Sequence, residues 1–158
     1  MVLTPTLTIA LYQPDIAQNT GTLIRTCACL GAGLAVIEPC GFVFGDKFMQ
    51  RAAMDYAERA AVDRHISWPR FMESLNGRRL VAVETPNIAP ASIPYTSFTF
   101  RPDDVLLLGP ESRGLPADAL AACAAAVYIP MQDGERSLNL AIAGAMVLGE
   151  ALRQIHRN

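Results

Sequence analysis

The chain has 158 residues, of which 51% are apolar and 18% charged, and its formal net charge is −2 at pH 7. This length predicts one compact domain over residues 1–158, because a domain of this size buries roughly 70% of the surface that its unfolded chain exposes. The slight acidic balance excludes an overall basic domain of the kind that attracts phosphates, and by itself gives no support for a nucleic-acid partner.

The candidate thiol and imidazole ligands are few: Cys27, Cys29, Cys40, Cys123, His65 and His156. Because no two cysteines have CxxC spacing, we predict neither a metal site nor disulfides, and interpret the cysteines as buried thiols in a reducing compartment. No charged leader precedes an apolar run at the N-terminus, and the longest apolar stretch, residues 138–148, is shorter than the ~20 residues that span a membrane. We therefore expect a cytoplasmic protein without membrane contact.

Five short apolar runs have the length and composition of buried strands. They are residues 7–12, 34–38, 80–83, 105–108 and 126–129. Because helix-like segments alternate with them, the pattern predicts an α/β domain with a mostly parallel sheet. Residues 85–103 contain four prolines and little periodicity, so we expect an irregular connection there rather than a linker between domains.

Four segments have the length and periodicity of helices. They are residues 20–30, 68–75, 116–122 and 137–156. Ser67 is a candidate N-cap of the second, which has Pro69 in its first turn. The last segment is apolar almost all the way round, with small residues at three- and four-residue spacings. Such a helix is either covered by its own chain or packs against a second subunit.

Basic residues are unevenly distributed along the chain. Seven of the thirteen lie between Lys47 and Arg79, where there are four acidic residues. On composition alone, a solvated surface of mixed charge is favoured over an RNA-binding surface.

Two glycine-containing loops follow predicted strands late in the chain, at residues 108–116 and 129–139. Since ligands of parallel α/β sheets bind beyond the carboxyl ends of the strands, the two loops would form one pocket. The alternative, which is favoured for each loop alone, is a tight turn between strand and helix. No GxGxxG, P-loop, GxSxG or HExxH motif is present, so the common nucleotide-binding, hydrolase and metalloprotease interpretations are excluded.

Arg25 lies on the first predicted helix among apolar neighbours. A guanidinium in such a place needs a fixed anion, because a buried unpaired charge is costly. A substrate phosphate would serve, but an ion pair with Glu111 or Asp15 is the better interpretation of the local pattern alone. Three further polar residues stand at predicted helix starts, where capping is the ordinary role: Asn19, Ser137 and Asn139.

Three blocks in this order resemble the signature motifs of the SPOUT superfamily of RNA methyltransferases. They are residues 19–25 (NTGTLIR), 108–116 (LGPESRGLP), and 129–131 (IPM) with 136–139 (RSLN). The short length and two further segments resemble the TrmL-type branch, which methylates the ribose of the tRNA wobble nucleotide: residues 37–42 (IEPCGF) and 51–56 (RAAMDY). The resemblance covers nearly the whole chain.

The resemblance implies a homodimer and a C-terminal trefoil knot, a rare exception to the rule against knots. It implies S-adenosylmethionine as the cofactor, held in the knot at the dimer interface around Val83, Gly109, Ile129, Ser137 and Leu138. It associates four residues with catalysis: Arg25, Glu111, Ser137 and Asn139.

The activity implied by the resemblance is methyl transfer to a ribose 2'-hydroxyl, which requires no metal. The acceptor would be the wobble nucleotide at position 34, cytidine or cmnm5-uridine, of tRNA-Leu isoacceptors, with the anticodon arm gripped by the dimer and by residues 47–79. A guanidinium is essentially always protonated, so Arg25 would act through a backbone phosphate rather than as a base.

Two departures from the family pattern concern the substrate side of the site. The sequence Glu84-Thr85-Pro86 stands where the family often has small or hydroxylated residues and a lysine, and Gly149 stands where some relatives carry a tyrosine. The alternative functions are a 2'-O-methyltransferase of another structured RNA, a non-catalytic RNA-binding relative, and an enzyme of conventional doubly wound fold that uses another nucleotide.

Overall fold

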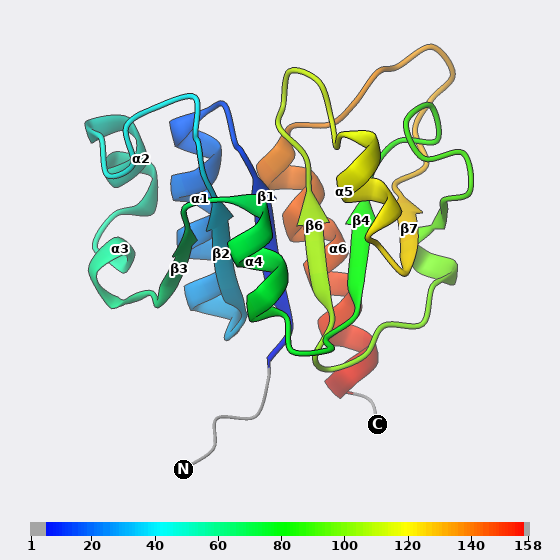
Figure 1. Ribbon diagram of the computed structural model, residues 1–158, viewed down its shortest axis with the longest axis horizontal. Helices are drawn as coiled ribbons and strands as arrows, with labels where there is room; N and C mark the ends of the chain where they lie inside the picture. Colours follow the sequence, from blue (N-terminus) through cyan, green and yellow to red (C-terminus); the bar gives the residue numbers. More distant parts are fainter. Residues whose placement is uncertain (1–5, 157–158) are drawn as a thin grey trace.

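The computed structural model describes residues 6–156 of the chain (Figure 1). One sheet of seven strands runs through the molecule in the order β3-β2-β1-β6-β4-β7-β5. The strands are β1 (Thr8–Tyr12), β2 (Gly33–Ile37), β3 (Val62–His65), β4 (Leu80–Val83), β5 (Ile93–Pro94), β6 (Val105–Leu108) and β7 (Ala125–Tyr128). All six neighbouring pairs in this sheet are parallel, so the carboxyl ends of the strands meet along one edge.

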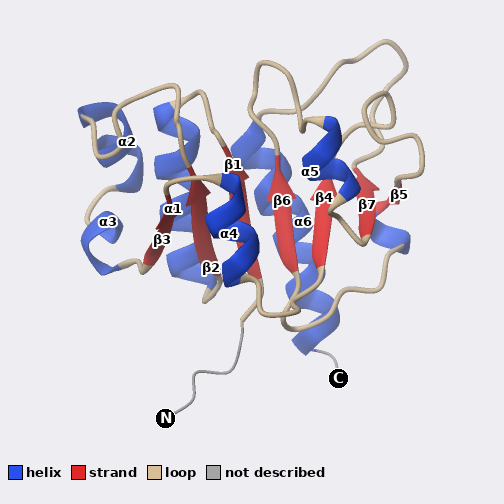
Figure 2. Ribbon diagram, in the orientation of Figure 1, coloured by secondary structure: helices blue, strands red, loops and turns tan. Residues whose placement is uncertain are grey.

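Helices cover both faces of the sheet. They are α1 (Ala17–Leu30), α2 (Lys47–Ala53), α3 (Tyr56–Arg59), α4 (Trp68–Ser74), α5 (Ala117–Ala121) and α6 (Leu140–His156), with a short 3-10 turn η1 at Tyr95–Ser97. Figure 2 shows α4 and α5 in front of the sheet and α1 and α6 behind it, with α2 and α3 to one side. The predicted α/β class is confirmed, and the sheet is wholly rather than mostly parallel.

Strand β1 lies inside the sheet, between β2 and β6, and all five of its residues are buried. Ile9 and Leu11 belong to the hydrophobic cluster on the side of α1 and α6, whereas Ala10 and Tyr12 belong to the cluster that includes α4. Strands covered on both faces are apolar without alternation, which is why this run was recognisable in the sequence.

All five predicted strands are present, with ends displaced by one residue at most. The two strands that the sequence analysis missed are β3 and β5. The residues of β3 are half-exposed or exposed, and β5 has only two residues, so neither has an apolar run. The segment 85–103 is otherwise irregular, as predicted.

The helices differ from the prediction in several places, among them α6, which begins at Leu140 rather than at residue 137, and α5, which is one residue shorter at each end than the predicted 116–122. Helix α1 begins at Ala17 rather than at residue 20, and α2 and α3 occupy residues 47–59, where only a mixed-charge segment was recognised. Helix α4 agrees with the prediction, because the Ser67 hydroxyl accepts a hydrogen bond from the Arg70 N–H.

The interpretation of every cysteine as a buried thiol is wrong for Cys29, which is exposed, and only in part right for Cys40 and Cys123, which are half-buried. Cys27 is buried, and its burial raises the pKa of its thiol to about 12. All four thiols are free. Between residues 6 and 156, no helix has the length and apolar character needed to cross a membrane.

At the opposite edge of the sheet, where the strands begin, two arginines form hydrogen bonds that join neighbouring segments. Asp104 is completely buried and accepts hydrogen bonds of 2.7 Å from both Nε and Nη2 of Arg79. Arg78 donates to the backbone oxygen of Asp103 at 3.0 Å and to the Thr8 hydroxyl at 2.9 Å. These two arginines belonged to the basic segment proposed to grip RNA, but they stabilise the edge of the sheet that is remote from the late loops.

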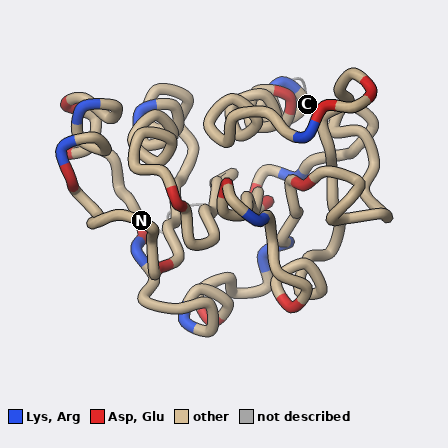
Figure 3. Tube along the Cα trace, turned by 90° about the horizontal axis from the view of Figure 1, so that it is seen from above, with Lys and Arg blue, Asp and Glu red and all other residues tan. Residues whose placement is uncertain are grey.

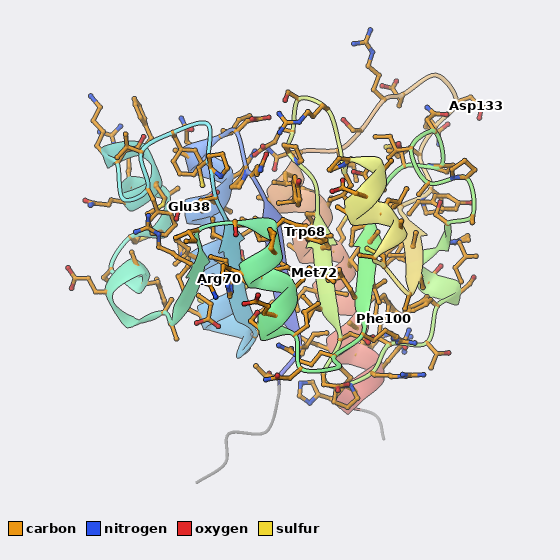
Figure 4. The ribbon with its side chains drawn as sticks, in the orientation of Figure 1. Glu38, Trp68, Arg70, Met72, Phe100 and Asp133 are labelled. Carbon is orange, nitrogen blue, oxygen red and sulfur yellow. The ribbon has the colours of Figure 1, made fainter. Side chains whose placement is uncertain are left out.

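Replacing Asp104 by alanine is expected to lower the free energy of unfolding by about 3–5 kcal/mol, because it leaves the Arg79 charge partly buried without its partner. Urea unfolding followed by circular dichroism measures this loss. The control is Arg70→Ala on α4 (Figure 4). Arg70 forms an ion pair with Glu73, and both side chains are about two-thirds exposed. An exposed pair of this kind contributes less than about 1 kcal/mol. Equal effects of the two substitutions would contradict the account.

Candidate cofactor pocket and active site

A cavity of about 560 Å³ opens at the carboxyl ends of β4, β6 and β7. Its walls come from five stretches of chain, at residues 16–19, 83–88, 108–114, 128–131 and 136–143. The two late loops therefore line one pocket, as predicted, and the volume is within the ~300–1,000 Å³ typical of small-molecule sites. Figure 4 shows Asp133 at the outer end of the second loop, well beyond the sheet.

The residues that the sequence analysis assigned to the cofactor all line this cavity: Val83, Gly109, Ile129, Ser137 and Leu138. Glu111 and Asn139 also line it, whereas Arg25 is outside its wall. The lining combines apolar side chains with backbone from two loops. In the part of the chain that the structure describes, no group of three or more His, Cys, Asp or Glu side chains is placed to hold a metal ion.

Two glycines give the first loop its shape. A Cβ atom on Gly109 would lie 2.5 Å from the Leu115 backbone nitrogen, and Gly114 has a left-handed φ of +72°. Residues other than glycine rarely adopt that backbone conformation. The tight path of residues 109–115 therefore depends on glycine at both positions. Leu115 is buried in the core on the α4 side of the sheet, which anchors the end of the loop.

A hydrogen-bonded chain of side chains joins the three sequence blocks. Asn139 donates from Nδ2 to Oδ1 of Asn19 at 3.0 Å, and Asn19 donates from its own Nδ2 to Oε1 of Glu111 at 3.1 Å. The capping role predicted for Asn19 is wrong, because α1 begins two residues before it. Asn139 does cap α6, since its Oδ1 accepts the N–H groups of Ala141 and Ile142. Ser137 lies outside the helix and is exposed.

A second set of contacts fastens the segment before α1 to the loop after β6. Oε2 of Glu111 accepts the Asp15 N–H at 2.7 Å, and Oδ2 of Asp15 accepts both the N–H and the hydroxyl of Ser112, at 3.0 and 2.6 Å. The Ser112 hydroxyl holds the pKa of Asp15 below its ordinary value. Glu111 and Asp15, the two candidate partners of Arg25, therefore form hydrogen bonds with other groups.

Replacing Asp15 by asparagine is expected to lower the urea midpoint at neutral pH, because a neutral amide is a weaker acceptor than a carboxylate. The folded pKa of Asp15 is lowered, so its stabilisation is present above the unfolded value of about 3.9 and is lost as the pH falls through the folded value. The difference between wild type and variant should therefore narrow below about pH 4. A pH-independent difference would contradict this assignment.

Arg25 projects from α1 toward α2 and α3 and is exposed. Its Nη1 lies 2.9 Å from the Met54 sulfur, and its guanidinium carbon lies 5.8 Å from the centre of the Tyr56 ring. The ion pair with Glu111 or Asp15 that was favoured for Arg25 is thus wrong. An exposed guanidinium held against a sulfur and a ring is available to bind an anion from solution.

Gly21 explains why α2 packs so closely on α1. A Cβ atom at Gly21 would overlap the Met49 carbonyl oxygen and lie 2.8 Å from the Ala52 Cβ. The absence of a side chain in the middle of α1 therefore brings Met54, at the end of α2, within reach of Arg25.

Residues 6–149 match the SpoU rRNA Methylase family. A relative from Beijerinckia indica, named tRNA (cytidine(34)-2'-O)-methyltransferase, is 54% identical over 149 residues, which are 93% of this chain and 91% of the relative.

Two solved structures share the fold over nearly the whole chain. One, described as "Structural insights into the 2-OH methylation of C/U34 on tRNA", has a TM-score of 0.89 and 40% identity, covering 97% of this chain and 98% of the other. The other is the SpoU methyltransferase AviRb from Streptomyces viridochromogenes in complex with the cofactor AdoMet. Its TM-score is 0.86 and its identity 27%, covering 99% of this chain and 60% of AviRb.

Proposed function

Since this chain belongs to the SpoU rRNA Methylase family, we propose that it transfers a methyl group from S-adenosylmethionine to the ribose 2'-hydroxyl of nucleotide 34 in tRNA. The observation that carries the proposal is the cavity at the strand ends, lined by all five residues assigned to the cofactor. The similarity to relatives named for methylation at nucleotide 34 supports tRNA rather than rRNA as the acceptor.

The pocket fits S-adenosylmethionine in size and in chemistry. Val83, Ile129 and Leu138 offer apolar surface for an adenine ring, and the loops at Gly109 and Ser137 offer backbone groups for its polar edge and for the methionine end. When bound, the cofactor supplies a methyl group activated by a sulfonium. The protein's part is to align that group with the ribose hydroxyl and to keep both in place.

Arg25 is the residue best placed to hold RNA next to the pocket. Its exposed guanidinium would bind a phosphate of the nucleotide whose hydroxyl reacts, since guanidinium groups match phosphate geometry in a two-bond contact. Glu111 and Asn139 act on the pocket side, where their bonds to Asn19 fix the spacing between α1 and the two loops. The exposed Ser137 would contact substrate directly.

The course of the chain after β7 is consistent with a trefoil knot. From β7, near one end of the sheet, residues 129–139 lead back to α6, which packs on α1, β4 and β6 (Figure 1). We infer that this last segment is threaded through the loops that follow the other strands, and that residues 1–158 make one domain.

Helix α6 presents an apolar stripe that supports a homodimer. Its inner side is buried, but Ile142 and Met146, which are spaced four residues apart on the helix, are 53% and 38% exposed, and Leu138, just before the helix, is 40% exposed. A Cβ atom on Gly149 would meet nothing within 4 Å. An aligned exposed stripe of this kind marks a protein interface. Light scattering at micromolar concentration should give twice the chain mass, and a monomer mass would contradict the dimer.

Several arginines of the basic segment 47–79 are paired with carboxylates, so fewer basic side chains are left to bind RNA. Arg64 pairs with Glu38, Arg70 with Glu73, and Arg79 with Asp104, as already described for the latter two. Lys47 and Arg51 remain exposed on α2, which packs against α1, the helix that carries Arg25. Figure 3 shows basic and acidic residues interspersed over the molecule rather than gathered on one face. We propose that this α1–α2 surface, rather than all of residues 47–79, contacts the anticodon arm.

The proposed acceptors are cytidine and cmnm5-uridine at position 34 of tRNA-Leu isoacceptors, and the proposed compartment is the cytoplasm. The test is transfer of labelled methyl from S-adenosylmethionine to bulk tRNA from a strain that lacks the activity, followed by nucleoside analysis. We expect a 2'-O-methylated cytidine or uridine derivative. No transfer to tRNA by a protein that binds the cofactor, or transfer only to ribosomal RNA supplied in parallel, would contradict the proposal.

A further inference from the structure

Glu84 carries a half-buried carboxyl in the pocket wall that the activity described so far does not use. It follows the last residue of β4 and lines the cavity. Its side chain reaches the loop after β6, where Oε1 accepts the Leu115 N–H at 2.7 Å. Its second oxygen, Oε2, accepts the Thr85 N–H at 3.2 Å. The carboxyl thus bridges the ends of β4 and of the loop between β6 and α5.

The glycines of that loop are packed against the same carboxyl. A Cβ atom on Gly109 would lie 2.9 Å from Oε1 of Glu84, and a Cβ atom on Gly114 would lie at the same distance. The carboxyl therefore occupies the space that side chains at both positions would require. Loop and carboxyl form one unit, in which the loop's shape depends on Glu84 as well as on its glycines.

We propose that Glu84 is a positioning residue for the cofactor, whose carboxyl holds residues 109–115 in the conformation that binds S-adenosylmethionine. The inference rests on the proposed function, because it takes this pocket to be the cofactor site. In the sequence, Glu84 stood out only because Glu84-Thr85-Pro86 departs from the family pattern.

The ionisation of Glu84 gives the proposal a pH dependence. Burial raises the pKa of the Glu84 carboxyl, and the N–H groups of Leu115 and Thr85 oppose that rise. The other charged groups that line the cavity are Glu111, which is bound to Asp15 and Asn19, Arg113, which donates to Gln13, and Arg136. On acidification the carboxyl takes up a proton and becomes a weaker acceptor, so the affinity for the cofactor should fall.

The test compares Glu84→Ala and Glu84→Gln with wild type by calorimetric titration of S-adenosylmethionine and by hydrogen exchange of the Leu115 amide in the cofactor-free protein. We expect Glu84→Ala to weaken binding by about 10-fold or more, as loss of a charge-assisted hydrogen bond does, and to speed exchange at Leu115. Glutamine keeps an acceptor oxygen but not the charge, so its affinity and its exchange rate should lie between those of Glu84→Ala and wild type. Only wild type should lose affinity on acidification, because only wild type keeps the Glu84 carboxyl, whose pKa is raised by burial.

The control is Glu73→Ala, which removes an exposed carboxylate from α4, away from the cavity, and should change neither quantity. Wild-type affinity and wild-type Leu115 exchange in Glu84→Ala would overturn the inference, provided that its unfolding transition shows a folded protein. Failure of the glutamine variant to recover either property would overturn it as well. A wild-type protein that binds the cofactor but methylates no tRNA contradicts the proposed function alone.

Discussion

Replacement of Arg25 by alanine is expected to reduce the turnover of methyl transfer by about 100-fold or more, while the affinity for S-adenosylmethionine stays at the wild-type value. The expectation follows from where Arg25 lies. Its guanidinium is exposed beside Met54 and Tyr56 and is outside the wall of the cofactor cavity. Its removal therefore leaves the pocket intact and takes away the proposed phosphate contact.

Single-turnover methyl transfer with saturating cofactor measures the first quantity, and calorimetry measures the second. Arg25→Lys should recover only part of the rate, because lysine keeps the charge but not the two-bond geometry. Arg70→Ala, which removes an exposed arginine on α4, is the control and should retain the wild-type rate. Equal loss of cofactor affinity and turnover in Arg25→Ala would contradict the division between pocket and phosphate contact.

Replacement of Gly109 by valine is expected to abolish cofactor binding. Its Cβ atom alone would lie 2.5 Å from the Leu115 nitrogen and 2.9 Å from Oε1 of Glu84, so the loop must move out of its observed path. Displacing a pocket wall by an ångström or more removes the alignment on which binding depends. Calorimetric titration with S-adenosylmethionine should show no measurable heat at concentrations that saturate wild type.

A crowded glycine outside the pocket separates this effect from a loss of stability. Gly33 begins β2 at the opposite edge of the sheet, and a Cβ atom there would lie 2.7 Å from the Thr8 hydroxyl oxygen. Gly33→Ala should therefore lower the unfolding temperature and keep cofactor affinity. Gly109→Ala carries the same crowded Cβ atom as Gly109→Val, so it should lose cofactor binding as well. Normal binding by Gly109→Val would show that this loop does not form the cofactor pocket.

The central part of the fold was predictable because its strands are covered on both faces. β1, β2, β4 and β6 are short apolar runs, and nearly all of their residues are buried. β3 was not predictable, since Asp63 and Arg64 are exposed and its pairing with β2 depends on backbone hydrogen bonds that every sequence can make. Helix α2 has only two buried residues, Met49 and Ala53, which is too weak a stripe to recognise among charges.

The site was predictable as a pair of loops but not as a network. Parallel topology alone brings the ends of β6 and β7 to one edge, and the family resemblance supplied the residues. The role of Asn19 depends on partners 92 and 120 positions away, Glu111 and Asn139, so no local pattern identifies it. The ion pair expected for Arg25 failed for the same reason, since Glu111 and Asp15 are held by nearby N–H and hydroxyl groups.

The measurement that tests the central claim most directly uses tRNA in which a single 2'-hydroxyl is removed. A tRNA-Leu with a 2'-deoxynucleotide at position 34 is compared with the same tRNA carrying the 2'-deoxynucleotide at position 35, both with labelled S-adenosylmethionine. The account predicts no methyl transfer to the first and wild-type transfer to the second. Transfer to the tRNA that lacks the hydroxyl at position 34 would contradict methylation of that ribose.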